Sequence, residues 1–235
     1  MEATPQPSRR DRKLGAMLFR QLRKEVSFEE EPFYLDRIAR VSERLHAAAP
    51  HHPFLKTVIP WMSERNAFTA PGEYIYFTRG LMERCPKEEH VAFVLGHEMA
   101  HHHLNHVALF DGWMGKLAEL PAAEIVPLVF SVLERRVYGP ERECEADRYA
   151  INLCWRAGYD AAICLELFDI LEHLALDAGD MDIVHGPDAD SDDELDPNAD
   201  WKTKTRIWWW QRTRGYLPIR DRRQRLVNHL RATRR

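Results

Sequence analysis

The sequence predicts an α+β fold that is mostly helical and contains one small antiparallel sheet. Segments with helical spacing of apolar residues dominate the chain, and the strand-like segments are few, short and confined to residues 54–77. The chain has 235 residues, of which 45% are hydrophobic and 30% are charged, as is ordinary for a globular protein. We expect residues 1–13, rich in proline and charge, to be disordered, and residues 14–235 to form a single domain.

The N-terminal third supplies all of the expected strands. Apolar residues recur at three- and four-residue intervals between Pro32 and Ala48, which predicts an amphipathic helix. Residues 54–59 (FLKTVI) are rich in apolar and β-branched side chains and predict a short strand. Residues 66–68 and 74–77 flank a Pro-Gly turn signal, so we expect them to form a hairpin.

Helices are expected over most of the remaining chain. A long helix should begin near Pro86, because proline is tolerated in the first turn, and run to about His106. Further helices are predicted over residues 112–138, from Pro140 to Gly158, and over residues 161–176.

Charge is unevenly distributed in the C-terminal part of the chain. Residues 177–200 carry ten acidic side chains and no Lys or Arg, and we expect an acidic loop there. Residues 201–235 carry twelve Lys and Arg against one Asp and are expected to form a basic helical region. This region lacks a nucleic-acid-binding motif, and the acidic loop can neutralise it, so no nucleic-acid partner is expected. For Trp208–Trp210 we favour core packing over a membrane-interface role, and membrane association is an alternative that we do not predict.

No targeting or membrane-spanning segment is apparent in the sequence. The N-terminus has no apolar core of signal-peptide length, and there is no run of about 18 apolar residues. We expect a cytoplasmic protein, or a periplasmic or secreted one if a leader has been removed. The four cysteines form no CxxC pair, and we expect reduced thiols.

Residues 97–101, His-Glu-Met-Ala-His, form an HExxH motif on the long predicted helix. His97 and His101 share one helix face, so their imidazoles can bind one zinc ion together. Glu98, next to the first ligand, can reach a metal-bound water as general base. Because the motif also arises by chance, a catalytic zinc requires a third protein ligand.

A candidate third ligand lies about forty residues downstream, on another predicted helix. Glu143 and Asp147 are one turn apart, and Glu143 would complete a His₂Glu ligand set. Asp147 would then lie near an imidazole N–H, where a carboxylate fixes the ring orientation. The alternative is a solvated acidic patch of Glu141, Glu143 and Glu145, but the pairing with HExxH favours a metal site.

Three segments together resemble a known family. Residues 66–82, 90–106 and 143–160 follow the order of the pre-helix strand, the active-site helix and the third-ligand helix in that family. The sequence resembles the CAAX-prenyl-protease and HtpX-like gluzincin zinc metallopeptidases over roughly residues 30–165. The resemblance implies a zincin-like metallopeptidase domain.

The resemblance also implies roles for individual residues. His97, His101 and Glu143 would bind one zinc ion, Glu98 would be the general base, and Asp147 would support a zinc-ligating histidine.

The same resemblance implies that the strand ahead of the helix lines the substrate cleft. The candidate cleft residues are Asn66 and Ala67 on one strand and Tyr74 and Tyr76 on the other. An exposed strand edge binds an extended peptide through main-chain hydrogen bonds, so the expected substrate is a protein or peptide, including an unfolded one.

The sequence departs from the family near its C-terminus. Family members carry a His-Pro pair followed by an arginine, and both help to stabilise the oxyanion. Here Pro218 and Arg223 fit this spacing, but Leu217 occupies the histidine position. Tyr216, His185 or an arginine would have to substitute, and Tyr216 and Arg223 are the candidates; alternatively, both are ordinary helix-entry residues.

The other histidines of the motif segment do not predict a second metal site. No carboxylate or thiol near His102, His103 and His106 completes a ligand set, so solvated or cleft-wall histidines are expected. Cys144 points away from Glu143 on a helix and is expected to be a packing residue.

Together these features predict a zinc-dependent endopeptidase that uses a zinc-activated water, with Glu98 as general base. Two alternatives remain open: a non-catalytic adaptor or chaperone-like protein with a structural metal site, and a latent enzyme whose N-terminal segment or acidic loop covers the zinc.

Overall fold

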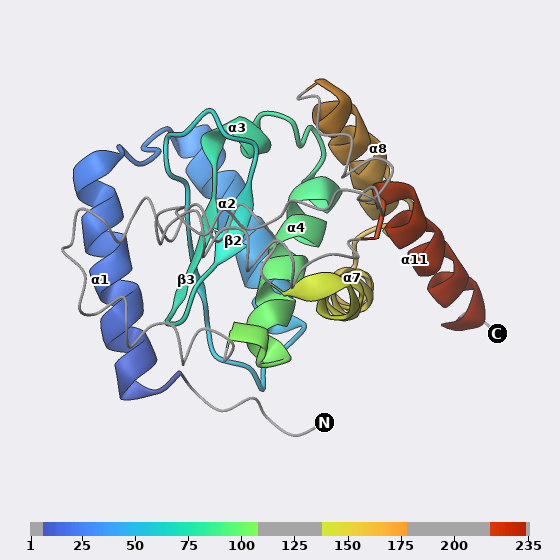
Figure 1. Cartoon of the computed structure of the whole chain (residues 1–235), viewed down its shortest axis with the longest axis horizontal. Coiled ribbons are helices and arrows are strands. Elements are labelled where there is room, and N and C mark those ends of the chain that lie inside the picture. The colour runs from blue at the N-terminus through green and yellow to red at the C-terminus, as the bar shows by residue number, and fades with distance from the viewer. Residues whose placement is uncertain (1–6, 108–137, 178–216, 234–235) are drawn as a thin grey trace, which may run out of the picture.

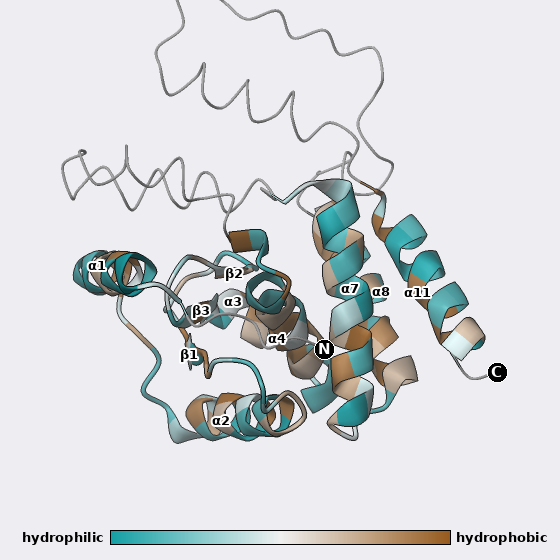
Figure 2. Cartoon of the chain, turned by 90° about the horizontal axis from the view of Figure 1, so that it is seen from below, coloured by the Kyte–Doolittle hydropathy of each residue, from teal (hydrophilic) through white to brown (hydrophobic). Residues whose placement is uncertain are grey.

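The computed structural model describes residues 7–107, 138–177 and 217–233, which form a small sheet flanked by helices (Figure 1). Helix α4 (Glu88–His103) lies at the centre of the molecule, between the sheet and the C-terminal helices (Figure 2). The helices dominate and the strands come early, which confirms the predicted α+β class.

The sheet has the order β1-β3-β2, with β1 at Lys56–Val58, β3 at Tyr74–Phe77 and β2 at Ala67–Thr69. Strands β2 and β3 form the predicted antiparallel hairpin. Strand β1, however, pairs in parallel with β3, so the sheet is mixed and not wholly antiparallel. The chain runs from β1 to the far edge of the sheet before it turns back, and this route inserts β3 in the centre. Strand β2 is therefore an edge strand.

Helix α1 (Arg9–Glu25) has no counterpart among the predicted helices, and its first residues, 9–13, are helical although the sequence predicts disorder there. A capping box explains this start: the Asp11 backbone N–H donates to the Ser8 hydroxyl (3.1 Å), and the Ser8 N–H donates to the Asp11 carboxylate (2.8 Å). Leu18 and Leu22 are then buried against the sheet. The apolar face of this helix, together with its cap, outweighs the charged composition of the segment.

Helix α1 covers the face of the sheet that points away from α4 (Figure 2). It approaches the hairpin turn so closely that a Cβ atom added to Gly15 would lie 2.7 Å from the Pro71 carbonyl oxygen. Gly72 in that turn has φ +118°, a conformation that glycine adopts without strain. The side chains between α1 and the sheet form a second, smaller core cluster that includes Phe68 and Tyr76.

The main core lies on the other side of the sheet. It is built by α2 (Pro32–Ala47), the short α3 (Arg79–Met82), α4, α7 (Gly139–Arg156) and α8 (Ala161–Asp177). Helix α4 is buried around most of its circumference, as expected for a helix without a polar face. All four cysteines are buried free thiols. No helix in the described ranges has the length and apolar character needed to cross a membrane.

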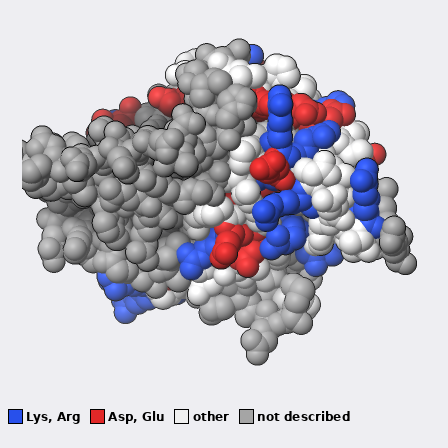
Figure 3. All heavy atoms as spheres, turned by 45° about the vertical axis from the view of Figure 1, so that its right-hand side comes forward, with Lys and Arg blue, Asp and Glu red and all other residues white. Residues whose placement is uncertain are grey.

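Helix α11 (Ile219–Thr233) closes the described part of the chain and packs on α7 and α8. Two of its arginines have acidic partners on α8: Arg220 contacts Glu172 at 2.5 Å and Arg223 contacts Asp169 at 3.6 Å. Figure 3 shows acidic and basic side chains interspersed on the side of the molecule where α8 and α11 lie. The predictions for residues 112–137, 178–200 and Trp208–Trp210 lie outside the described residues.

Candidate metal centre and active site

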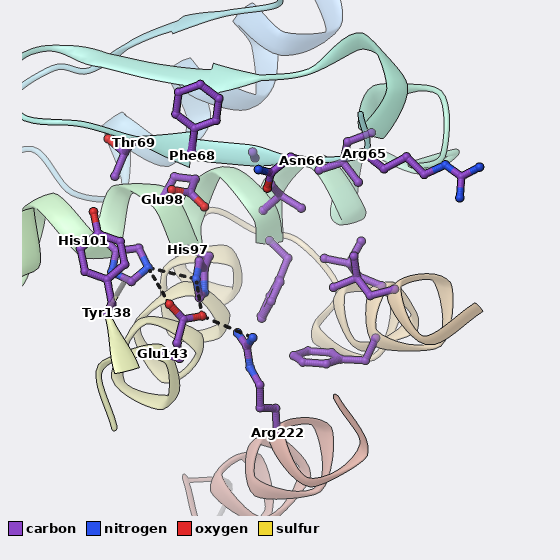
Figure 4. A pocket seen from close by; sticks show the side chains of 17 residues that line it. Arg65, Asn66, Phe68, Thr69, His97, Glu98, His101, Tyr138, Glu143 and Arg222 are labelled. Atoms are coloured by element: carbon purple, nitrogen blue, oxygen red, sulfur yellow. Dashed lines mark hydrogen bonds and ion pairs between the residues drawn. The ribbon is translucent and has the colours of Figure 1, made fainter. Parts of the chain in front are cut away.

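Three potential metal ligands converge from two helices. His97 and His101 lie one turn apart on α4, and Glu143 lies on α7. The two Nε2 atoms are 3.1 Å apart, and the Glu143 carboxylate lies 3.4 Å from His97 Nε2 and 3.6 Å from His101 Nε2. One donor atom from each residue lies within 4.8 Å of the others (Figure 4). The three residues are therefore positioned to hold one metal ion.

The second nitrogen of each imidazole is engaged elsewhere, which fixes the ring orientation. His97 Nδ1 lies 3.0 Å from the Asp147 carboxylate, and His101 Nδ1 lies 3.0 Å from His106 Nδ1. Both Nε2 atoms are thereby turned toward Glu143. Metal-binding histidines in proteins are held in this way, with the distal ring nitrogen hydrogen-bonded. The donor set, two imidazole nitrogens and one carboxylate, fits a catalytic zinc site.

The carboxylates dominate the electrostatics of this cluster. Burial alone would lower the pKa of His97, but the adjacent Asp147 and Glu143 carboxylates raise it to about 10. Burial would raise the pKa of Glu143, yet its contacts with His97 and the Arg222 guanidinium hold that pKa well below its usual range. Glu143 therefore carries its negative charge near neutral pH, and its carboxylate neighbours make His97 strongly basic.

Glu98 lines the same pocket as the ligand cluster. It lies between α4 and strand β2 (Figure 4), with 7% of its surface exposed. Burial raises its pKa to about 7, although the nearby His97 and a hydrogen bond from the Thr69 backbone N–H act in the opposite direction. A carboxylate with a pKa in this range can both accept and release a proton near neutral pH.

An arginine of α11 reaches the cluster, but it is Arg222 and not the predicted Arg223. Arg222 donates two hydrogen bonds to Asp147, at 2.6 and 2.7 Å, and lies 3.3 Å from the Glu143 carboxylate. Arg223 is half-exposed and pairs with Asp169 of α8. Tyr216, the other candidate oxyanion residue, lies outside the described residues.

The proposed cleft residues separate into two groups. Asn66 and Ala67 line the pocket beside the ligand cluster, at edge strand β2. Tyr74 and Tyr76 lie on the central strand and belong to the cluster under α1, where Tyr76 is fully buried. The structure thus places only the edge-strand pair at the pocket.

The remaining motif histidines are buried and not solvated. His102 Nε2 contacts the Thr69 hydroxyl at 2.5 Å, which links α4 to strand β2. His103 Nδ1 contacts the Tyr149 hydroxyl at 2.6 Å, and its ring stacks on His52. These histidines are buried because α4 packs against α2, α7, α8 and the sheet, which leaves the helix no solvent-facing side.

Tyr138 and Arg222 contact the ligand cluster but are not among the site residues that the sequence predicts. Tyr138 stacks on the His101 ring with centroids 3.7 Å apart, and Arg222 closes the far side of the cluster. Tyr138 immediately precedes α7, five residues before Glu143, and only this proximity could have indicated it. The sequence gives no signal for Arg222, because the face of α11 that meets the cluster depends on how this helix is rotated when it docks.

The model of peptidase family M48 matches residues 34–197, which cover most of the chain and include all three ligand residues. The chain belongs to peptidase family M48. The match ends before α11, so Arg222 lies outside the matched range of the M48 domain.

One curated relative is the mitochondrial metalloendopeptidase OMA1 of Arabidopsis thaliana. It is 27% identical over 165 residues, which cover 65% of this chain and 33% of the relative. The chain thus spans about a third of the length of that protein. The match supports the M48 assignment, and the CAAX-protease or HtpX-like subgroup stays a prediction.

Proposed function

We propose that this M48 domain is a zinc-dependent endopeptidase. The observation that carries the proposal is the convergence of His97 Nε2, His101 Nε2 and the Glu143 carboxylate in a pocket that Glu98 also lines. A structural zinc site has four protein ligands, whereas a catalytic one has three and an open position. When bound, zinc supplies Lewis-acid polarisation of a carbonyl and lowers the pKa of a water molecule toward ~7.

Glu98 is assigned the proton transfers. Its carboxylate accepts a proton from the attacking water and passes it to the leaving amine. The buried position of Glu98 and its pKa of about 7 suit both steps, because the group must be ionised first and protonated afterwards.

The edge of β2 is assigned to substrate binding. The Asn66 carbonyl faces the neighbouring strand β3, because it accepts a hydrogen bond from the Thr78 N–H (3.0 Å). The Thr69 N–H faces the opposite, open edge of the sheet, where it donates to Glu98. Backbone groups alternate in direction along a strand, so those of Ala67 point to the open edge. An extended segment of substrate can pair with them as an added strand.

This mode of binding selects for extended chains. A folded protein rarely exposes a free extended segment, so we propose unfolded or loosely structured protein segments as the substrate. The main-chain contacts at Ala67 carry no sequence information by themselves.

The test combines one substitution with metal analysis. The Glu98→Gln variant should keep its bound zinc and lose cleavage of unfolded casein by ~10²-fold or more, because only the proton acceptor is removed. Zinc content, measured by atomic emission, and casein cleavage with and without a chelator are the readouts.

Two outcomes would contradict the proposal. Cleavage by Glu98→Gln equal to that of the parent would show that the base is assigned wrongly. A zinc-loaded parent protein that cleaves no unfolded substrate would favour the non-catalytic adaptor role instead.

A further inference from the structure

Helix α1 carries a cationic face that no other described element covers. The helix holds seven Lys and Arg against two acidic residues. All seven cations are exposed: Arg9, Arg10, Arg12, Lys13, Arg20, Arg23 and Lys24. Among the described elements, α1 forms one edge of the molecule in both views (Figure 1 and Figure 2), so a partner can contact it along its whole length of about 25 Å.

Helix geometry places the charges of opposite sign on opposite sides of α1. At about 100° per residue, the seven cations fall within an arc of about 160° around the helix axis. Leu18 lies on the opposite side, where it is buried against the sheet. Asp11 and Glu25 are each seven residues from Leu18, and hence only about 20° from it around the helix. The outward face of α1 therefore carries cations and no carboxylate of its own.

The fold does not account for these positive charges. Four of them lie within the first five residues of α1, where the positive end of the helix dipole disfavours cations. Among the described residues, none of the seven forms an ion pair. On α11, by contrast, Arg220, Arg222 and Arg223 each contact a carboxylate. Cations that oppose the helix dipole and neutralise no described carboxylate are suited to an anion outside the chain.

The composition of this face favours a flat anionic surface over a nucleic acid. Within the cationic arc the other residues are Ala16 and Met17, so the arc has no Ser, Thr, Asn, Gln or aromatic side chain. Proteins that bind nucleic acids add such side chains to hydrogen-bond the bases or to stack on them. The headgroups of an anionic bilayer need only positive charge close to their plane. A straight helix at the edge of the molecule can meet such a plane along its whole length.

The apolar side of α1 is not free to enter a bilayer. Leu18 and Leu22 are 3% and 1% exposed, and the backbone at Gly15 is packed against the hairpin turn. A helix that inserts into the interface must present its apolar side to the acyl chains. A contact made through α1 is therefore electrostatic and can be reversed by salt.

We propose that the outward face of α1 is a docking surface for the anionic headgroups of a phospholipid bilayer. The pocket with the ligand cluster lies on the other side of the sheet, so a bilayer at α1 leaves this pocket open to substrate. The sequence alone does not predict this surface, because the composition of residues 1–13 predicts disorder.

The test is sedimentation of the full chain with phosphatidylcholine vesicles that contain or lack phosphatidylserine. The parent should bind only the anionic vesicles, and salt at about 1 M should release it, because the Debye length then falls to ~3 Å. A triple variant, Lys13→Gln with Arg20→Gln and Lys24→Gln, should weaken this binding by roughly 100-fold, since each cation near such a surface contributes about 5-fold. These three exposed side chains point within about 40° of one another, and glutamine keeps the helix propensity.

The matched control removes three exposed arginines that lie outside α1: Arg84→Gln, Arg225→Gln and Arg231→Gln. It changes the net charge by the same amount and should bind anionic vesicles nearly as the parent does. Thermal unfolding followed by circular dichroism checks that both triple variants fold.

Several results would overturn the docking surface: no binding of anionic vesicles by the parent, equal binding of neutral vesicles, or equal losses in the two triple variants. A parallel measurement replaces the vesicles with duplex DNA at the same phosphate concentration. Tighter binding of DNA than of vesicles, lost in the α1 variant, would make nucleic acid the partner and overturn the lipid assignment. None of these results bears on the peptidase function, so the two proposals fail separately.

Discussion

At the scale of single residues, the site depends on which imidazole nitrogen carries a proton. A nitrogen that binds a metal carries no proton, so His101 bound to zinc through Nε2 would carry its proton on Nδ1 and donate it to His106 Nδ1. His106 then carries its own proton on Nε2, which lies 3.3 Å from the Glu145 carboxylate. His101 is thus oriented through a second histidine, whereas His97 is oriented directly by Asp147.

This relay predicts a role for His106 in metal affinity. Replacing His106 with leucine removes the acceptor for His101 Nδ1–H and should weaken zinc binding by roughly 10- to 100-fold. Glu145→Gln should have a smaller effect, because the Glu145 side chain is 51% exposed and its charge is screened by solvent. Zinc affinity is measured by competition with a chromophoric chelator, and the ¹⁵N shifts of His101 report its tautomer. An unchanged zinc affinity in His106→Leu would contradict the relay.

Helical spacing accounts for the site residues that the sequence could indicate. His97 with His101, and Glu143 with Asp147, are pairs at four-residue separation, so each is aligned by local helix geometry alone. The sequence indicates Arg223, whereas the arginine at the cluster is its neighbour Arg222. The rotation of α11 about its own axis decides between them, and that rotation is set by how the helix docks. Neighbouring residues on a helix point about 100° apart, so Arg222 faces the candidate metal site while Arg223 faces the surface.

At the scale of elements, the site depends on the close crossing of α4 and α7. Gly96 directly precedes the first histidine ligand and faces Ala150 of α7. A Cβ atom added at Gly96 would lie 3.4 to 3.6 Å from atoms of Ala150, which is ordinary van der Waals contact for one methyl group. A larger side chain has no space there, and it would move the helix that carries Glu143.

Two substitutions at Gly96 should therefore have opposite effects. Gly96→Ala should keep zinc affinity and raise the free energy of unfolding by up to about 1 kcal/mol, because alanine favours the helix. Gly96→Val should separate α4 from α7, weaken zinc binding and lower stability by about 1–3 kcal/mol through overpacking. Chemical denaturation and zinc competition measure both quantities. If Gly96→Val binds zinc as tightly as Gly96→Ala, the crossing does not set the ligand geometry.

The sheet shows which elements the sequence could and could not predict. The Pro-Gly turn specified the β2–β3 hairpin because a hairpin is a local structure. The parallel pairing of β1 with β3 depends on how the hairpin docks against a distant segment, and no residue near β1 encodes it. The charged, proline-containing composition of residues 1–13 predicts disorder, whereas the Ser8–Asp11 capping box and the apolar face of α1 start a helix at Arg9.

At the scale of the whole molecule, α11 completes a site whose other parts lie far earlier in the chain. Arg222 contacts Asp147, 75 residues away, and both side chains are almost fully buried. Asp147 also orients His97, so the docking of α11 and the geometry of the metal centre share one carboxylate. Burial would raise the pKa of Asp147, but Arg222 and His97 hold it below its usual value.

Removing this arginine should affect stability and metal binding together. Arg222→Met keeps the length of the side chain but leaves Asp147 with one fewer charged partner in a buried position, a change that costs roughly 3–5 kcal/mol in comparable buried pairs. Arg223→Met is the matched control, because Arg223 is 43% exposed and its pair with Asp169 is worth at most about 1 kcal/mol. The free energy of unfolding from urea denaturation, with zinc affinity measured in parallel, should fall sharply for Arg222→Met and little for Arg223→Met. Equal losses in the two variants would mean that α11 is held by its apolar face alone, and that the ionic contact is incidental to both folding and the metal centre.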